Sequence, residues 1–264
     1  MRSTNPILSR SNAFSRGGAA TLDNNSLTTE QLQGMYDAPS AVATRRMTMD
    51  DVVMRTGLLL LVAVATAAVA WQFRGASAAY PVAIGAAIGG FGIAMVVSFK
   101  RMINPPLIIA YAALEGVFLG IISGIFNDAF NGIVVQAVLG TAAAFVGMLV
   151  AYRAGVIKVT PRFTKMLVGA TIGFLLLAVT NWVFALVAGG DGLGLRSGVL
   201  GLLFGAVGIV LATLFLALDF HLVEQGIRAG APERESWLAA FGLMVTLVWL
   251  YLEILRFISI LRGD

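Results

Sequence analysis

Seven long apolar runs constrain the fold of this chain more than any other feature. They cover roughly 53–73, 80–98, 106–126, 132–152, 164–188, 197–222 and 237–261. Each run is long enough to cross the ~30 Å hydrocarbon core of a bilayer as an α-helix that rises about 1.5 Å per residue. We therefore predict an all-α integral membrane protein with seven transmembrane helices.

The composition is typical of a membrane protein. Hydrophobic residues make up 58% of the 264 residues and charged residues only 12%, whereas about 25% of a soluble domain is charged. The chain has no cysteine, which excludes disulfides, thiolate metal sites and cysteine nucleophiles. The net charge of +4 comes from basic residues in short loops between the apolar runs. This placement of the basic residues is typical of a protein oriented in a lipid bilayer and argues against nucleic-acid binding. We therefore expect the lipid bilayer to be the main partner.

The first part of the chain differs from the rest. Residues 1–46 are rich in Asn, Ser, Thr, Gly and Gln and show no apolar periodicity, which is typical of a flexible, solvated segment. We predict a flexible polar cytoplasmic tail over 1–46 and a seven-helix membrane domain over 47–264. Prolines support the helix boundaries, because five of them fall at or just before proposed helix starts: Pro81, Pro105, Pro106, Pro161 and Pro232.

Lysine and arginine are distributed unequally between the two sides of the membrane. The tail and the second, fourth and sixth loops hold Arg45, Arg46, Lys100, Arg101, Arg153, Lys158, Arg162, Lys165, Arg228 and Arg234. The other side holds Arg74, Arg196 and Arg262. The asymmetry predicts a multi-pass protein of the cytoplasmic membrane with its N-terminus in the cytoplasm and its C-terminus outside. A re-entrant segment would return the C-terminus to the inside.

Four of the runs carry two glycines spaced four residues apart. Small residues at this spacing let helix backbones approach closely in a membrane. The four pairs together favour a compact bundle. Any single pair could instead reflect the general frequency of glycine in membrane helices. The pairs are Gly85 and Gly89, Gly116 and Gly120, Gly169 and Gly173, and Gly201 and Gly205.

Three carboxylates lie within the apolar runs: Glu115, Asp219 and Glu253. An aspartate at a helix centre costs about 2.5–3.5 kcal/mol, so such residues are functional candidates by default. Two carboxylates that share a site hold one proton between them over a wide pH range and would form a pH-sensitive switch. The alternatives are a salt bridge between Glu253 and Arg256, three residues later, and a simple helix-end position for Asp219.

Motifs of soluble enzymes are absent from the sequence. The single histidine, His221, lies two residues after Asp219 and points to another side of the helix, so the two cannot chelate one ion. No HExxH, GxSxG, Walker or GxGxxG context occurs. Asp219 is the only aspartate within an apolar run, which fits an intramembrane aspartic protease poorly. We expect no enzymatic activity and no bound cofactor.

Three segments resemble the bacterial form of the Bax-inhibitor (transmembrane Bax inhibitor motif) family, over about residues 48–262. LALDFHLVEQG, which contains Asp219, resembles the sixth-helix YD…Q segment of that family. LYLEILRFISIL, which contains Glu253, resembles its last-helix LYLDFINLF segment, and YAALEGVFLG, which contains Glu115, is similar to its third helix.

The resemblance implies a fold in which the last helix is central and is wrapped by the other six. It also implies a calcium leak gated by an acidic pair on the last two helices. Asp219 and Glu253 match that pair and would contact Ca²⁺, with Glu115 as a further candidate for pH sensing or the ion pathway. Arg256 and the basic pair Lys100 and Arg101 are the matching candidates for a gate or latch.

The partner of Asp219 stays open at this stage. The link from Asp219 to Glu253 is longer than in the family pattern, and a turn near residues 230–232 would place Asp219 beside residues 242–246 instead. Thr246 stands in that range and cannot share a charge. The second run also lacks the acid with which some relatives latch the arginine that Arg256 resembles. Glu115 could serve either as the acidic partner of Asp219 or as the acid that latches Arg256.

Three classes of function fit these observations. The first is a pH-sensitive passive calcium (cation) leak channel gated by intramembrane carboxylates, because hard cations prefer oxygen ligands. The second is a non-transporting regulator that binds other membrane proteins, such as an AAA-type membrane protease, through the tail or the glycine faces. The third is a proton-coupled small-molecule transporter, because carboxylates also serve carriers.

Overall fold

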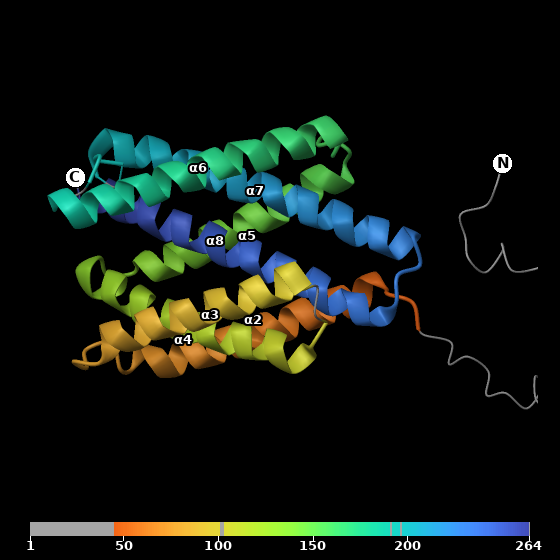
Figure 1. The fold of residues 1–264 in the computed structure, drawn as a ribbon, viewed down its shortest axis with the longest axis horizontal. Helices are drawn as coiled ribbons and strands as arrows, with labels where there is room; N and C mark the ends of the chain where they lie inside the picture. Colours follow the sequence, from red (N-terminus) through yellow and green to blue (C-terminus); the bar gives the residue numbers. More distant parts are fainter. Residues whose placement is uncertain (1–44, 101–102, 191, 196, 264) are drawn as a thin grey trace, which may run out of the picture. The chain divides into compact units, whose positions relative to one another are not determined.

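The computed structural model of the protein describes residues 45–263 apart from 101–102, 191 and 196 (Figure 1). In this part of the chain seven helices are long and apolar enough to cross a membrane, which confirms the predicted fold class. They are α2 (Met49–Trp71), α3 (Ala79–Lys100), α4 (Pro105–Ala129), α5 (Ile133–Arg153), α6 (Pro161–Ala188), α7 (Gly198–Arg228) and α8 (Ser236–Gly263), with a short 3-10 helix, η2 (Glu233–Glu235), before α8. The predicted tail lies outside the described residues except for its last two, Arg45 and Arg46.

Local signals explain where the helices begin and end. Thr48 caps α2 in a capping box, in which its hydroxyl accepts a hydrogen bond from the Asp51 N–H and the Asp51 carboxylate accepts one from the Thr48 N–H. Prolines occupy the first turns of α4 and α6. The turn after α7 contains Gly230 at φ 68°, a conformation that favours glycine. The helix bounds follow the predicted runs closely, although α7 continues to Arg228 instead of ending near 222.

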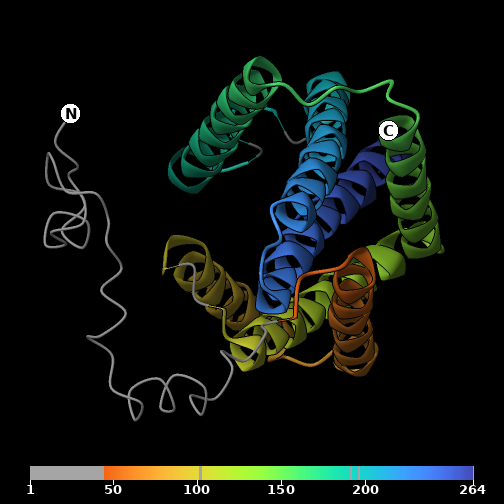
Figure 2. The same ribbon diagram turned by 90° about the vertical axis from the view of Figure 1, so that its right-hand side faces the viewer.

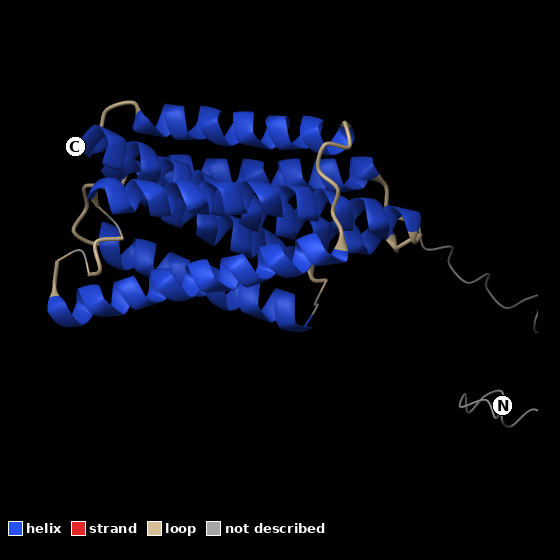
Figure 3. Cartoon of the chain, turned by 90° about the horizontal axis from the view of Figure 1, so that it is seen from above, coloured by secondary structure: helices blue, strands red, loops and turns tan. Residues whose placement is uncertain are grey.

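Helix α8 lies at the centre of the bundle. The helices run back and forth along one direction (Figures 1 and 3), and the view along that direction shows α8 with α7 beside it and the other helices around them (Figure 2). Helices α7, α2 and α5 pack directly against α8, whereas α3 packs mainly on α4 and α6 on α7. In the most apolar stretch of α8, 56% of the residues are buried, the highest share among the seven helices. This agrees with the central last helix that the resemblance implied.

One of the predicted glycine pairs lies directly against the backbone of another helix. A β-carbon on Gly116 or Gly120 of α4 would overlap the α2 backbone at Ala63 and Ala67, respectively. By contrast, a β-carbon on Gly169 of α6 would meet open space. The α2–α4 contact therefore depends on glycine, and the pair on α6 serves no such contact.

The two ends of the bundle differ in charge. The start of α2 and the connections α3–α4, α5–α6 and α7–α8 lie at one end, which we call the basic end. Its described basic residues include Arg45, Arg46, Arg55, Lys100, Arg153, Lys158, Arg162, Lys165, Arg228 and Arg234. At the opposite end, the described basic residues include Arg74 in the α2–α3 connection and Arg262 in the last turn of α8.

Candidate functional site

Polar side chains line the contact between the last two helices. On α8, Thr246, Trp249 and Glu253 follow one another at intervals of three and four residues, so they share one face of the helix. On α7, Asp219 lies beside Thr246, and Gly208 lies beside Glu253. We call this contact, formed by these five residues, the α7–α8 seam.

Among the described residues, the hydroxyl of Thr246, and no charged side chain, holds Asp219. Its Oδ2 atom accepts a hydrogen bond from Thr246 Oγ1 at 2.6 Å. Its Oδ1 atom faces Gly242 of α8, where an added β-carbon would lie 3.9 Å away. A hydrogen bond to a charged group contributes about 1.5–3 kcal/mol, which offsets part of the cost of burying a carboxylate, about 2.5–3.5 kcal/mol at a helix centre. The Thr246 hydroxyl therefore favours the ionised form of Asp219 over the neutral one.

Asp219 lies between two cavities and lines both of them. The first, of about 350 Å³, extends from Asp219 to the α7–α8 connection at the basic end. The second, of about 420 Å³, lies among α3, α6, α7 and α8. Ser98, Thr171 and Thr246 bring hydroxyls to this second cavity. Thr171 Oγ1 is buried and has no hydrogen-bond partner in the described part of the chain. The oxygens around Asp219 thus suit a cation that sheds part of its hydration shell.

Glu253 lies farther from the basic end of the bundle than Asp219 does. The Trp249 indole N–H donates a hydrogen bond to Glu253 Oε1 at 3.2 Å. The carboxyl group lies directly over Gly208 of α7, where an added β-carbon would be 2.7 Å from the Glu253 Cδ atom and 2.9 Å from Phe174 Cζ. Glycine at 208 is therefore what lets α7 accept this carboxyl group.

The structure does not bring Asp219 and Glu253 together. Thr246 and Glu253 are two turns of α8 apart, about 10 Å along the axis, and Asp219 and Gly208 are about 16 Å apart on α7. Of the two registers that the sequence left open, the chain adopts the one that places Asp219 beside Thr246. The seam therefore carries two separate carboxylates in place of an adjacent pair. Within the described residues, no three His, Cys, Asp or Glu side chains form a group that could hold a metal ion.

Trp249 of α8 and Phe215 of α7 lie along the seam between the two carboxylates, and two further rings follow on from Trp249. The ring of Trp249 lies 5.9 Å from that of Phe215 and 6.1 Å from that of Phe174, measured between centroids. Phe174 in turn stacks on Phe204 at 4.2 Å. Trp249 and Phe215 also line the larger cavity beside Asp219. Trp249 therefore both lines that cavity and contacts Glu253.

The candidate latch residues lie at opposite ends of the bundle. Arg256, nearly one turn after Glu253, donates a hydrogen bond from Nη2 to the Leu195 carbonyl in the α6–α7 connection at 3.0 Å. The Leu195 N–H donates to Asn181 Oδ1 of α6 at 3.3 Å, so Arg256 ties α8 to a connection that α6 also holds. Lys100 is the last residue of α3 and is exposed at the basic end. Arg101 lies outside the described residues.

Glu115 faces α3, whereas Asp219 faces α8. A β-carbon on Gly90 of α3 would lie 3.6 Å from Glu115 Oε1. Gly90 stands one turn before Ala94, which lines the larger cavity beside Asp219. Glu115 thus lies next to the wall of that cavity and away from the seam.

Three residues around the seam were not expected from the sequence. Trp249 could have been found, because it precedes Glu253 by one helical turn. Ser98 and Thr171 come from α3 and α6, and hydropathy does not reveal which helices are neighbours. Their contribution to the site emerges only from the packing.

The fold and the seam define a polytopic membrane protein with carboxylates spaced along the contact of its last two helices. Comparison with known families matches residues 5–263 to the model described as Bax inhibitor 1 like. The chain belongs to that family, as the resemblance predicted. A comparison with curated proteins found no match.

Proposed function

We propose that the protein is a pH-sensitive passive leak channel for Ca²⁺ and similar cations. It lies in the cytoplasmic membrane with its basic end in the cytoplasm and its C-terminus outside. The observation that supports this most is the Asp219 carboxylate, which Thr246 holds between two cavities on the α7–α8 seam. In this proposal the protein is a channel and not an enzyme, and Ca²⁺ is the permeant ion and not a resident cofactor.

The proposed path follows the seam. A cation from the outer side meets Glu253, passes the aromatic rings around Trp249, and reaches Asp219 and the hydroxyls of the larger cavity. It then leaves through the smaller cavity toward the basic end. Carboxylate and hydroxyl oxygens replace part of the hydration shell, while single ligands spaced along a path keep binding weak enough for release. The aromatic rings form the closed barrier, and conduction needs them to move.

The proposed pH response arises at Asp219. An ionised carboxylate attracts a divalent cation, and a protonated one does not, so protonation removes the main attraction on the path. The cation flux therefore decreases as the pH falls through the titration of Asp219. Because Thr246 stabilises the ionised form, the same hydroxyl also sets the pH at which the flux decreases.

Ca²⁺ flux into liposomes that contain the purified protein tests this proposal. Asp219→Asn keeps the shape of the side chain and can still accept the Thr246 hydrogen bond, but it removes the charge. We expect the flux to fall about tenfold or more, because losing an attraction of at least ~1.4 kcal/mol changes ion occupancy by that factor. Glu224→Gln is the matched control, since Glu224 is also on α7 but binds Tyr152 at 2.7 Å and Arg228 at 2.5 Å, away from the seam.

The same assay separates the leak from the other two classes of function. Flux equal to that of empty liposomes, or equal effects of Asp219→Asn and Glu224→Gln, would overturn the leak. Absence of flux together with a co-purifying membrane protein that is lost on deletion of residues 1–46 would favour the regulator. Saturable uptake of a small molecule would favour the transporter.

A further inference from the structure

The four residues before α2 are fixed to the α7–α8 connection. We call residues Arg45–Thr48 the strap. The Met47 N–H donates a hydrogen bond to the Ala231 carbonyl at 2.8 Å, and the Glu233 N–H donates to the Arg45 carbonyl at 2.7 Å. Arg46 and Pro232 form an antiparallel bridge between these two bonds. The strap is therefore paired, residue by residue, with the turn that joins the two helices of the seam.

The pairing places the Met47 side chain in the cavity below Asp219. Met47 is only 5% exposed and lines the smaller cavity together with Asp219. It packs so closely on Gly226 of α7 that a β-carbon there would lie 2.7 Å from Met47 Cε. Asp219 and Gly226 are two turns apart on one face of α7, about 10 Å along the axis. Met47 therefore lies in the wall of the cavity beside Gly226, about two helical turns from Asp219 toward the basic end.

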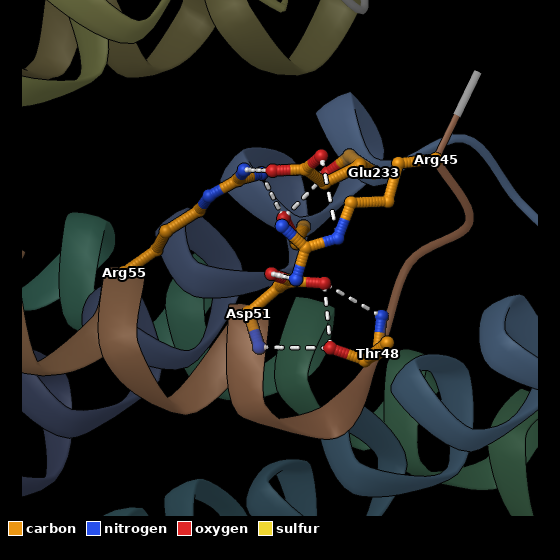
Figure 4. A network of polar contacts seen from close by, with 6 residues as sticks. Arg45, Thr48, Asp51, Arg55 and Glu233 are labelled. Atoms are coloured by element: carbon orange, nitrogen blue, oxygen red, sulfur yellow. Dashed lines mark hydrogen bonds and ion pairs between the residues drawn. The ribbon is translucent and has the colours of Figure 1, made fainter. Parts of the chain in front are cut away.

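An ion-pair network joins the start of α2 and Arg45 of the strap to Glu233 in the α7–α8 connection (Figure 4). Arg55 of α2 binds the Glu233 carboxylate at 2.6 Å and the Glu233 carbonyl at 2.6 Å, and it also contacts the hydroxyl of Ser236. The side chain of Arg55 is 15% exposed and that of Glu233 32%, so solvent screens this pair only in part. Arg45 also lies near Glu233, at 3.9 Å, but its side chain is 70% exposed. Arg55 is thus the main residue that holds Glu233 in place.

We propose that the strap is a plug, in which Met47 closes the basic end of the Asp219 cavity and the Arg55–Glu233 pair keeps it closed. The plug gives the path a second closure, separate from the aromatic rings, on the other side of Asp219. Its role in conduction rests on the proposed function, whereas its effect on access to the cavity does not. Methionine suits the position because its flexible, apolar side chain fills an irregular gap without binding a cation tightly.

Thiol accessibility tests the plug without any measurement of flux. The chain has no cysteine, so Ala239→Cys places a single thiol in the wall of the smaller cavity. We expect a charged, membrane-impermeant thiol reagent to modify it slowly. Adding Glu233→Gln should raise the modification rate about tenfold, because losing one charge-assisted contact changes an opening equilibrium by about that factor. Adding Met47→Ala should also raise the rate, because alanine no longer fills the cavity beside Gly226. Adding Met47→Leu should leave the rate low, because leucine keeps the bulk.

Arg228→Cys, at an exposed position on the same helix as Asp219, is the control. Its modification rate should be the same with and without the strap substitutions, and each variant should elute and unfold like the parent protein. If Met47→Ala and Glu233→Gln both leave the Ala239→Cys rate unchanged, the plug is wrong, whatever the flux. If both raise that rate in a protein that conducts no Ca²⁺, the plug stands and the leak is wrong.

Discussion

At the scale of single residues, Thr246 is the sharpest test of the proposed pH response. Thr246→Val keeps the volume of the side chain but removes the hydroxyl that donates to Asp219. We expect the pH of half-maximal Ca²⁺ flux to rise by about one unit, because a hydrogen bond to a charged group contributes about 1.5 kcal/mol and one pH unit corresponds to 1.36 kcal/mol. A fluorescent Ca²⁺ indicator inside liposomes at a series of pH values measures the profile.

Thr213→Val is the matched control for that substitution. Thr213 is on α7, and its hydroxyl donates to the Ile209 carbonyl of its own helix at 2.7 Å. Loss of the Thr213 hydroxyl should leave the pH profile of the Ca²⁺ flux unchanged. Identical profiles for Thr246→Val and the parent protein would mean that Asp219 does not set the pH response.

The sequence predicted part of this residue-level arrangement. A turn near residues 230–232 would place Asp219 beside residues 242–246, because antiparallel helices joined by a short turn pair at matching distances from it. Thr246 was therefore one of the alternatives that the sequence left open, and the structure adopts it. The place of Glu253 could not be found in this way. It depends on Gly208 of α7, and a glycine in an apolar helix does not show which side chain will lie against it.

At the scale of helices, Gly116 and Gly120 determine how closely α2 and α4 pack. Gly116→Ala or Gly120→Ala places a methyl group against the α2 backbone, and overpacking of this kind costs about 1–3 kcal/mol. Gly169→Ala, on the open side of α6, should instead be neutral or stabilise the helix by about 0.5–1 kcal/mol. Thermal unfolding in detergent micelles should therefore give a lower melting temperature than the parent for Gly116→Ala and Gly120→Ala. The melting temperature of Gly169→Ala should equal or exceed that of the parent.

A common melting temperature for all three variants would contradict the close α2–α4 contact. The sequence alone ranked the four glycine pairs equally, because the spacing is the same in each. Only the neighbours differ: the pair on α4 meets the backbone of another helix, while Gly169 of α6 meets open space. Which glycines matter is thus a property of the packing.

At the scale of the whole molecule, the basic end should lie in the cytoplasm. Single cysteines in the cysteine-free chain test this. Lys158→Cys, exposed in the α5–α6 connection, should react with an impermeant thiol reagent only after the cells are permeabilised. Ser77→Cys, exposed in the α2–α3 connection, should react in intact cells. If instead only Lys158→Cys reacts in intact cells, the basic end lies outside and the proposed direction of the path is reversed. If both cysteines react in intact cells, the protein does not have a single orientation.

Hydropathy was sufficient to predict the number of helices and most of their ends, because the bilayer requires long apolar helices and the prolines mark their starts. It did not predict the neighbours of each helix. The placing of α3 on α4 and α6 on α7 follows from side-chain packing between apolar surfaces that all look alike in the sequence. The wall of the Asp219 cavity and the strap over its end were missed for that reason.

The central claim is that Asp219 makes the α7–α8 seam a pH-sensitive path for Ca²⁺. The most direct measurement is Ca²⁺ flux through the purified protein in liposomes from about pH 5 to pH 8, for the parent chain beside Asp219→Asn. The parent flux should rise with pH and exceed that of empty liposomes, whereas Asp219→Asn should show a low flux that no longer depends on pH. A variant that matches the parent at every pH would contradict the claim.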